Sequence, residues 1–352
     1  MMASPTRRDR ILGALLGVHA GDSLGATVEF SSWEEIRESH PHGVRDIVGG
    51  GPFNWPAGHA TDDTDLTRAV LLGYRDAKQL DVSTSTEKPD VVKLSANHML
   101  DWYEGRWPDR REGQRPCDIG GATAVGIRKL RLNGGDPRRA GAGQGKAGNG
   151  SLMRCIPTAL FGPKEEEESL SLETNESMAI SAVTHDDTVC TLACAVYNAI
   201  VRALVEGQGS VEAWQRGRDV LKRLPVGAEN SVAEAARKVE AAIDGARFQL
   251  GRVDDLAGKG PKGGLNGAKL LPFKASGYVL ESLIIAVAAL FDTRSLEEVL
   301  IDVVRIGKDT DTNAAIAGGL LGARDGVDAI PKRWRDKLQF SGEFTEIVDF
   351  ML

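Results

Sequence analysis

The chain has 352 residues, with 43 Lys and Arg against 50 Asp and Glu, and a formal net charge of -7. This balance argues against a protein that coats nucleic acid, because phosphate contacts call for a basic surface, and 41% hydrophobic with 26% charged residues excludes a mainly disordered chain. The longest apolar runs, such as 283–291, fall well short of the roughly 18 residues of a membrane span, so we expect neither a membrane nor a nucleic acid as partner.

Helical periodicity dominates the chain from end to end. Apolar residues recur at helical spacing in 11–16 and 66–74, and the segments 189–205, 277–291 and 314–321 are apolar on nearly every side. Short β-branched runs bounded by turn residues, which would indicate strands, are scarce. The pattern predicts an all-α fold, one compact domain over residues 1–352 with a flexible start at 1–8. Three polar stretches are expected to be surface loops: 81–89, 165–176 and 251–267.

Several familiar motifs are absent or out of context. The sequence Gly143 to Gly148 satisfies G-x-G-x-x-G, but no strand precedes it, so a dinucleotide-binding fold is not indicated. The chain has no P-loop, no zinc-binding His pair and no G-x-S-x-G elbow. Its four cysteines form no Cys-x-x-Cys pair, which predicts reduced thiols and a cytoplasmic location.

Two acidic segments, 61–65 (TDDTD) and 309–312 (DTDT), each open an apolar helical pattern. A single segment of this kind is expected to cap its helix, because Thr and Asp side chains accept hydrogen bonds from free N–H groups and favour the helix dipole. Capping needs only one side chain, however, and several carboxylates in one turn repel each other. If the two segments face each other, their five aspartates and the threonine hydroxyls supply the hard oxygen ligands that Mg²⁺ or Mn²⁺ prefers, and a pair of ions is the expected result.

Three further polar residues are ambiguous by themselves. His185 precedes another apolar helix and would ordinarily be a satisfied histidine at a helix start, while Asp22 and Glu29 flank a glycine-marked turn and could be surface acids. An Asp-rich isoprenoid synthase is not supported, because Asp62-Asp63-Thr64-Asp65-Leu66 lacks the final acid of D-D-x-x-D.

Taken together, these segments resemble the ADP-ribosylglycohydrolase family, and in particular its dinitrogenase-reductase-activating glycohydrolase branch. The resemblance runs in the family's order and covers nearly the whole chain, and the TDDT and DTDT pair is its most specific part. The similar stretches are GDSLGATVEF (21–30), HGVRDIVGGG (42–51), ATDDTD (60–65), AGNGSLMRCIP (147–157), THDD (184–187), GYVLES (277–282), GKDTDTNAAIAG (307–318) and GVDAIPKRW (326–334).

The resemblance implies an all-α orthogonal helical bundle with two Mg²⁺ ions, or Mn²⁺, at the bottom of a cleft. The metal ligands that it implies are Thr61, Asp62, Asp63, Asp309, Asp311 and Thr312. The catalytic base would be Glu29, Asp63 or Asp309, and the sequence does not choose among them. The substrate-binding residues that it implies are Glu29, Gly120, Gly121, Gly148, Asn149, Gly150, Ser151, Met153, His185 and Tyr278, with the glycines presenting N–H groups to a pyrophosphate.

The implied reaction is hydrolysis of the bond between ADP-ribose and a protein side chain, arginine-linked by preference, with ADP-ribose as product. O-linked serine, poly(ADP-ribose), O-acetyl-ADP-ribose and a non-catalytic ADP-ribose-binding relative stay open, and a monomer is expected. The chain departs from the family at Gly121, where an acid or amide is frequent, and at Lys308, where glycine is common. The Gly121 departure suggests that a proton-handling group is missing there.

Glycine is over-represented, with 41 residues or about 12% against a usual ~7%. Two groups, between Gly13 and Gly58 and between Gly120 and Gly150, include the segments that the resemblance assigns to ligand binding. We therefore expect these loops to bind ADP-ribose mainly through main-chain amides. A third group, within 251–267, has no such assignment.

Overall fold

The computed structural model describes residues 4–82, 88–163, 175–225, 228–249 and 275–352. The predicted loop 251–267 and parts of the two other predicted loops lie outside these ranges. The described residues contain helices and no strand, which confirms the all-α prediction. The α-helices are α1 (Arg7–Gly25), α2 (Trp33–Ser39), α3 (Asp62–Val82), α4 (Val91–Tyr103), α5 (Gly121–Leu132), α6 (Ile156–Phe161), α7 (Glu176–Ala182), α8 (Thr188–Val205), α9 (Ser210–Leu221), α10 (Asn230–Gln249), α12 (Val279–Phe291), α13 (Leu296–Val304), α14 (Thr310–Asp325), α15 (Lys332–Arg335) and α16 (Ser341–Met351), with short 3₁₀ turns at Pro137–Arg139 and Val327–Ala329.

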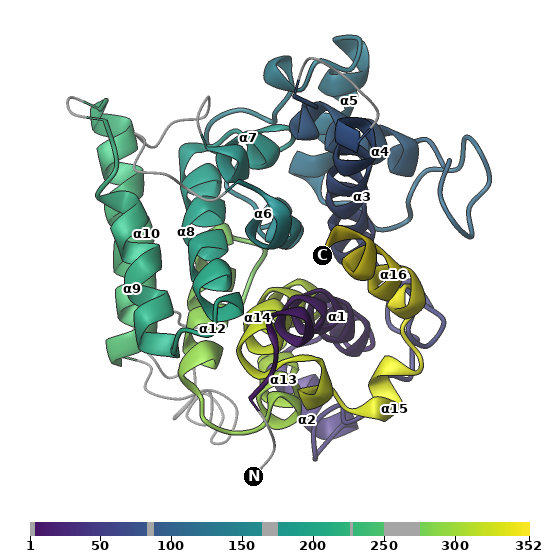
Figure 1. The fold of residues 1–352 in the computed structure, drawn as a ribbon. Coiled ribbons are helices and arrows are strands. Elements are labelled where there is room, and N and C mark those ends of the chain that lie inside the picture. Colours follow the sequence, from purple (N-terminus) through teal and green to yellow (C-terminus); the bar gives the residue numbers. More distant parts are fainter. Residues whose placement is uncertain (1–3, 83–87, 164–174, 226–227, 250–274) are drawn as a thin grey trace.

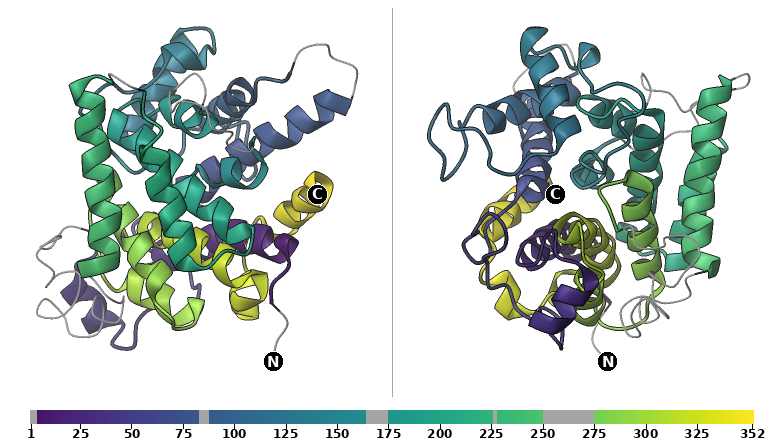
Figure 2. Two further views of the ribbon diagram at one scale, coloured as in Figure 1. Left: turned by 60° about the vertical axis from the view of Figure 1, so that its left-hand side comes forward. Right: turned by 180° about the vertical axis from the view of Figure 1, so that it is seen from behind.

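The first and last thirds of the chain meet in a central pair of helices, α1 and α14, which lie side by side (Figure 1; Figure 2, right). Helices α3, α4 and α5 lie to one side of this pair, and α8, α9, α10 and α12 lie to the other. One continuous apolar core includes residues from α1 through α16. The site described below lies where the N-terminus of α14 meets the C-terminus of α1.

A stripe of glycines allows α1 and α14 to pack backbone to backbone. Gly13, Gly17, Gly21 and Gly25 recur every fourth residue, which places them on one face of α1. A Cβ on Gly17 would lie 2.2 Å from the carbonyl oxygen of Gly318, and one on Gly21 would lie 2.0 Å from that of Ala314. These α1 glycines therefore serve helix packing, and the expectation that the first glycine group binds ligand is wrong for them.

Helix α8 has the length and apolar character to cross a membrane, but 89% of its apolar window is buried inside the protein. It packs against α7, α9, α10 and α12. Its composition is thus that of a core helix surrounded by other helices, as the sequence indicated.

The N-terminal end of α1 corrects one prediction. Thr6 and Asp9 form a reciprocal capping box, so that the helix begins at Arg7. Residues 6–8 are therefore part of a capped helix, contrary to the flexible segment expected at 1–8.

Candidate active site

The two predicted acidic segments meet. Asp63, in the first turn of α3, accepts hydrogen bonds on Oδ2 from Thr61 Oγ1 in its own segment and from Thr312 Oγ1 in the other, both at 3.2 Å. Asp63 is fully buried and Asp311 is 2% exposed. The glycine stripe explains the meeting, because it brings the start of α14 against Gly25 at the end of α1.

Capping does not account for these acids. Asp309 is the N-cap residue of α14, yet its side chain makes no capping hydrogen bond. Its Oδ2 instead accepts from the Asn149 side chain at 2.7 Å. In α3 the hydroxyl of Thr61, and no carboxylate, accepts from the N–H of Asp63. The carboxylates are thus available for another purpose.

Asp22 and Asp65 both have structural partners. Asp22 is fully buried within α1 and accepts on Oδ2 from the N–H groups of Thr61 and Thr64 at 3.1 and 3.2 Å, so it anchors the start of α3 and is no surface acid. Asp65 accepts from the indole N–H groups of Trp102 and Trp107 at 2.8 and 2.7 Å, which separates it from the other four predicted aspartates.

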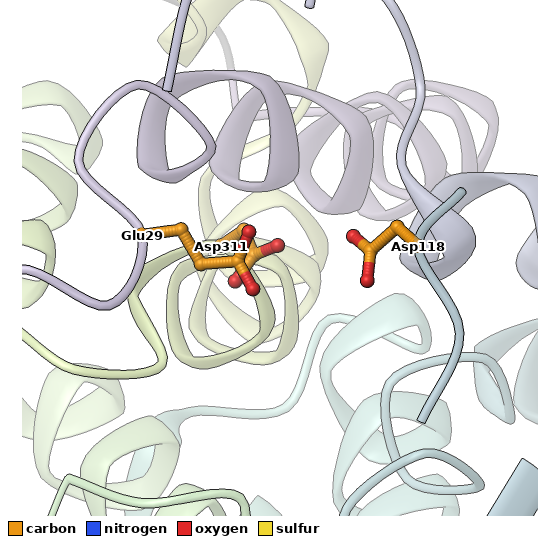
Figure 3. Close-up of side chains that lie close together, drawn as sticks. All are labelled: Glu29, Asp118 and Asp311. Atoms are coloured by element: carbon orange, nitrogen blue, oxygen red, sulfur yellow. The ribbon is translucent and has the colours of Figure 1, made fainter. Parts of the chain in front are cut away.

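One acid was missed by the sequence reasoning. Asp118, in the loop before α5, faces Glu29 and Asp311 across the site, and one carboxylate oxygen of each lies within 4.8 Å of the others (Figure 3). The sequence signal was present in the Asp118-Ile119-Gly120-Gly121 turn, but the resemblance directed attention to Gly121. The acid stands three positions earlier, so this turn does carry a carboxyl group. We call Glu29, Asp62, Asp63, Asp118, Asp309 and Asp311 the acidic cluster.

Burial and mutual repulsion dominate the electrostatics of the acidic cluster. Burial, and then the charges of neighbouring carboxylates, raise the pKa of Glu29 to about 8 and that of Asp118 to about 9. The pKa of Asp62 is raised to about 7, again mainly by burial. The same causes raise the pKa values of Asp63 and Asp311 well above the ordinary range.

The donor set of the acidic cluster fits a hard divalent cation. Buried carboxylate oxygens without a hydrogen-bond partner occur in Glu29, Asp63, Asp118 and Asp311. Buried polar atoms are ordinarily satisfied, so each of these oxygens calls for a partner. Oxygen ligands without nitrogen or sulfur suit Mg²⁺ or Mn²⁺ better than zinc or copper. The residues that could hold such ions are the six acids with the hydroxyls of Thr61 and Thr312.

Five members of the acidic cluster line a cavity of about 500 Å³, with Asp62, Asp309 and Asp311 in its floor and Glu29 and Asp118 in its wall. Most of the predicted residues line it: Glu29, Asp62, Gly120, Gly121, Gly148, Asn149, Gly150, Met153, His185, Asp309, Asp311 and Thr312. Sequence reasoning had not assigned Phe30, Asp118, Ile119, Ala122, Thr123 and Ser276 to it. Its walls thus include several glycine loops, and its floor is lined by carboxyl groups.

Four predicted residues do not line this cavity. Thr61 and Asp63 lie beneath its floor, where neither has any exposed surface. The side chain of Ser151 is turned away and its hydroxyl accepts from Ser181 at 2.9 Å. Tyr278 is 38% exposed and joins the site only through its backbone, which pairs with Gly148 in an isolated antiparallel bridge.

The segment 148–151, called here the glycine loop, is fixed to the acidic cluster through Asn149. The Asn149 side chain donates to Ser282 Oγ at 3.0 Å and to Asp309, and its backbone N–H donates to the carbonyl of Gly277 at 2.9 Å. A Cβ on Gly150 would lie 2.9 Å from both Thr123 Oγ1 and His185 Cε1. Only glycine fits there, because the loop packs closely against these two side chains.

The rim residues Phe30 and Lys308 share an unusual backbone conformation. Their φ angles are +64° and +69°, in the left-handed region that favours glycine. Phe30 N–H donates to the carbonyl of Lys308 at 2.8 Å, and Lys308 N–H donates to that of Ser31 at 2.7 Å. This pairing joins the segment of Glu29 to that of Asp309, and it explains in physical terms why glycine suits position 308.

A smaller cavity of about 150 Å³ lies on the other side of the floor. It shares Asp62 and Asp118 with the large cavity, and its other walls include Trp55, Trp102 and Arg110. The two shared carboxylates therefore face both spaces.

A comparison with known protein families identifies the family of this chain. The model of the family described as ADP-ribosylglycohydrolase matches residues 3–352. The chain belongs to the ADP-ribosylglycohydrolase family. It is therefore a hydrolase enzyme, as the sequence resemblance implied.

Individual relatives agree with this assignment. The ADP-ribosyl-[dinitrogen reductase] glycohydrolase of Rhodospirillum rubrum is 29% identical over 347 residues, which cover 97% of this chain and 94% of that protein. The ADP-ribosylarginine hydrolase Tri1 of Pseudomonas putida (strain GB-1) is 28% identical over 95% of this chain and 75% of its own length. A solved structure described as an ADP-ribosylglycohydrolase-related protein complex superposes with a TM-score of 0.67 at 25% identity, covering 98% of this chain and 97% of the other.

Proposed function

We propose that this ADP-ribosyl hydrolase cleaves the N-glycosidic bond between ADP-ribose and arginine side chains of proteins and that it requires two Mg²⁺ or Mn²⁺ ions. The observation that carries the metal proposal is the acidic cluster, whose buried carboxylate oxygens have no partner at the floor of a glycine-walled cavity. The preference for arginine rests on the likeness to an ADP-ribosylarginine hydrolase.

The six ligands expected from the sequence would hold the ions, with the carboxyl groups of Glu29 and Asp118 beside them. When bound, divalent ions offset the repulsion between the carboxylates and lower the pKa of oxygen groups that they coordinate. Asp63 and Asp311 are the most buried of the cluster, with 0% and 2% exposure, so a ligand role suits them better than proton transfer.

Two acids are placed to handle protons. Glu29 and Asp118 both line the cavity, and their pKa values of about 8 and about 9 without metal mean that each can carry a proton near neutral pH. One of them can accept a proton from the attacking water while the other donates to the leaving nitrogen. Carboxylates beside the ribose would also stabilise the positive charge that develops in an oxocarbenium-like transition state.

The glycine loop is suited to the pyrophosphate. Backbone N–H groups bind phosphate oxygens at close range only where no side chain intervenes. Gly148 and Gly150 both line the cavity, and Gly150 is the better candidate because the N–H of Gly148 already donates to the carbonyl of Lys146. An anionic floor opposite this loop leaves the distal ribose, which carries no charge, as the part of ADP-ribose that reaches the acids.

The test is a substrate panel with and without metal. Arginine-linked and serine-linked ADP-ribosyl peptides are incubated with the metal-stripped protein and with added Mg²⁺ or Mn²⁺, and free ADP-ribose is measured. We expect release from the arginine peptide only with metal, and none from an Asp311→Asn variant. Release from the serine peptide alone would replace the arginine proposal by an O-linkage activity. Release in metal-stripped buffer would overturn the two-metal proposal, and calorimetric binding of ADP-ribose without turnover would indicate a binding protein.

A further inference from the structure

A fully buried arginine connects the glycine loop to His185. Arg154 has no exposed surface, and its guanidinium donates to the carbonyl of Gly150, to that of Ile180 at 3.3 Å and to Thr184 Oγ1 at 2.7 Å. Among the described residues no carboxylate pairs with it. Burying a cation without a carboxylate partner is unfavourable for the free energy of folding. The contact of Arg154 with the glycine loop therefore calls for an explanation beyond packing.

Thr184 links the guanidinium of Arg154 to the imidazole of His185. Its Oγ1 lies 2.8 Å from His185 Nδ1. A guanidinium only donates hydrogen bonds, so Thr184 Oγ1 accepts the bond from Arg154. The single proton of the Thr184 hydroxyl can then be donated to a second acceptor. In the described part of the chain His185 Nδ1 is the acceptor within reach. The hydroxyl therefore donates to Nδ1, and a neutral His185 carries its proton on Nε2.

The surroundings of His185 keep the ring neutral. The side chain is 2% exposed, and burial followed by the charge of Arg154 lowers its pKa to about 3. Other ionisable groups from the packed elements are the thiols of Cys190 and Cys194 on α8 and the carboxylates of Asp186 and Asp187 beside it. None of them makes a hydrogen bond to the imidazole among the described residues.

The free ring nitrogen faces the glycine loop. A Cβ on Gly148 would lie 3.2 Å from His185 Nε2, and one on Gly150 would lie 3.3 Å from it. His185 also lines the large cavity. A proton on Nε2 is thus presented beside Gly148 and Gly150, in the wall of the large cavity.

We propose that Arg154 and Thr184 are positioning residues that fix His185 as a neutral Nε2–H donor, so that it completes the hydrogen-bond donors of the glycine loop. The acceptor is a phosphate oxygen of ADP-ribose, and this part rests on the proposed function. A neutral donor of fixed tautomer contributes a hydrogen bond without placing a further charge in the cavity, and no reorientation is needed when the ligand enters.

NMR spectroscopy can determine the tautomer of His185 directly. Long-range ¹H–¹⁵N NMR of the ¹⁵N-labelled full-length protein at pH 7 distinguishes protonated from unprotonated ring nitrogens, and a His185→Gln variant assigns the signals. We expect Nδ1 unprotonated and Nε2 protonated in the wild type. Thr184→Val should yield a mixture of tautomers, and Thr184→Ser, which retains the hydroxyl, should restore the wild-type pattern.

A buried threonine outside the network provides the matched control. Thr191 on α8 is 2% exposed and donates to the carbonyl of Thr188, so Thr191→Val should leave the signals of His185 unchanged. In turnover assays Thr184→Val should raise KM about tenfold, as loss of one hydrogen bond implies, with little change in kcat, and Thr184→Ser should restore it.

Two results would overturn the proposal: a proton on Nδ1 in the wild type, or an unchanged tautomer and KM in Thr184→Val. If the protein turned over no ADP-ribosylated peptide, the proposed function would fail, but the NMR pattern would still decide whether Arg154 and Thr184 fix the ring. The two failures are therefore distinguishable.

Discussion

At the scale of single residues, the site is defined by carboxylates that lack partners. A buried acid with an unsatisfied oxygen is unfavourable for the folded protein by itself, and it persists where function needs it. Asp63 and Asp311 have this property on the floor, and Glu29 and Asp118 have it at the cavity wall. Substitutions at the two kinds of position should therefore have different consequences.

On the floor, Asp311→Asn should abolish metal-dependent turnover while the fold is retained. We expect turnover to fall at least about 100-fold, because substitution of a residue that only supports a metal ligand already lowers metal affinity or activity by about 10–100-fold. The metal-free variant should be more stable than the metal-free wild type at pH 8, because a repelled buried charge is removed. Activity assays and thermal melts in EDTA measure the two effects. Asp328→Asn is the control, because the Asp328 side chain is 92% exposed. Wild-type turnover in Asp311→Asn would contradict a ligand role.

At the cavity wall, Asp118→Asn should lower kcat by about 10²–10⁴-fold, the usual contribution of a proton-transferring group. The melting temperature of the metal-free variant should not fall, because a carboxyl whose pKa is raised to about 9 disfavours the folded protein at neutral pH. The neighbouring Cys117 is exposed, so Cys117→Ser provides a matched control with unchanged kcat. An Asp118→Asn enzyme with normal kcat would leave Glu29 as the sole candidate for proton transfer at this wall.

At the scale of elements, the pair α1 and α14 determines where the acids lie. The acidic segments sit at helix starts because Thr and Asp begin helices, but their distance from each other depends on how closely two backbones approach. Glycine at every fourth position of α1 permits this approach, and the start of α14 is then placed beside the start of α3. Helix packing thus assembles the donor set.

Gly17→Ala should therefore destabilise the protein by about 1–3 kcal/mol or more, the usual cost of overpacking. Its Cβ would lie 2.2 Å from a carbonyl oxygen of α14. Gly342 in α16 is the matched control, because a Cβ there meets nothing within 4 Å. Gly342→Ala should stabilise the helix slightly, by up to about 1 kcal/mol. Urea unfolding midpoints measure both variants, and equal midpoints would show that the stripe does not set the packing.

At the scale of the whole molecule, the buried acids should couple stability to pH and to the proposed metal ions. A carboxyl whose pKa is higher in the folded protein than in the unfolded chain takes up protons on folding, so its contribution to stability falls as pH rises. For Glu29 and Asp118 this decline runs from about pH 4 to about pH 8 and 9, respectively. Metal-free protein should lose stability over this range.

Mg²⁺ should accordingly raise the melting temperature far more at pH 8 than at pH 5.5, where protons occupy the ligands. At 100 times its Kd the ion would add about 2.7 kcal/mol at pH 8. Buried His19 and His185, whose pKa values are lowered to about 3, destabilise the protein below about pH 6.5 in the presence and absence of metal alike. The difference between melts with Mg²⁺ and with EDTA at each pH isolates the acids. An equal shift at both pH values would contradict proton competition.

The sequence predicted what is local and missed what depends on tertiary contact. Apolar periodicity identified α8 and α14, and the Thr-Asp segments were found because they start helices. Asp118 was overlooked because nothing in a loop sequence reveals which acid turns inward. Arg154 and Thr184 are polar residues in apolar surroundings, and only the folded chain brings them to the imidazole. The α1 glycines were misassigned because composition does not distinguish a helix contact from a ligand contact.

The antiparallel contact between α1 and α14 also bears on how the enzyme is made. Gly17 and Gly318 touch although about 300 residues separate them along the chain, so this contact closes a long loop at an entropic cost. A nascent chain exposes the glycine face of α1 long before its partner has been synthesised. The complete acidic cluster, and with it the proposed metal site, cannot assemble until α14 emerges, so we expect hydrolytic activity only from chains whose synthesis has reached the last helices.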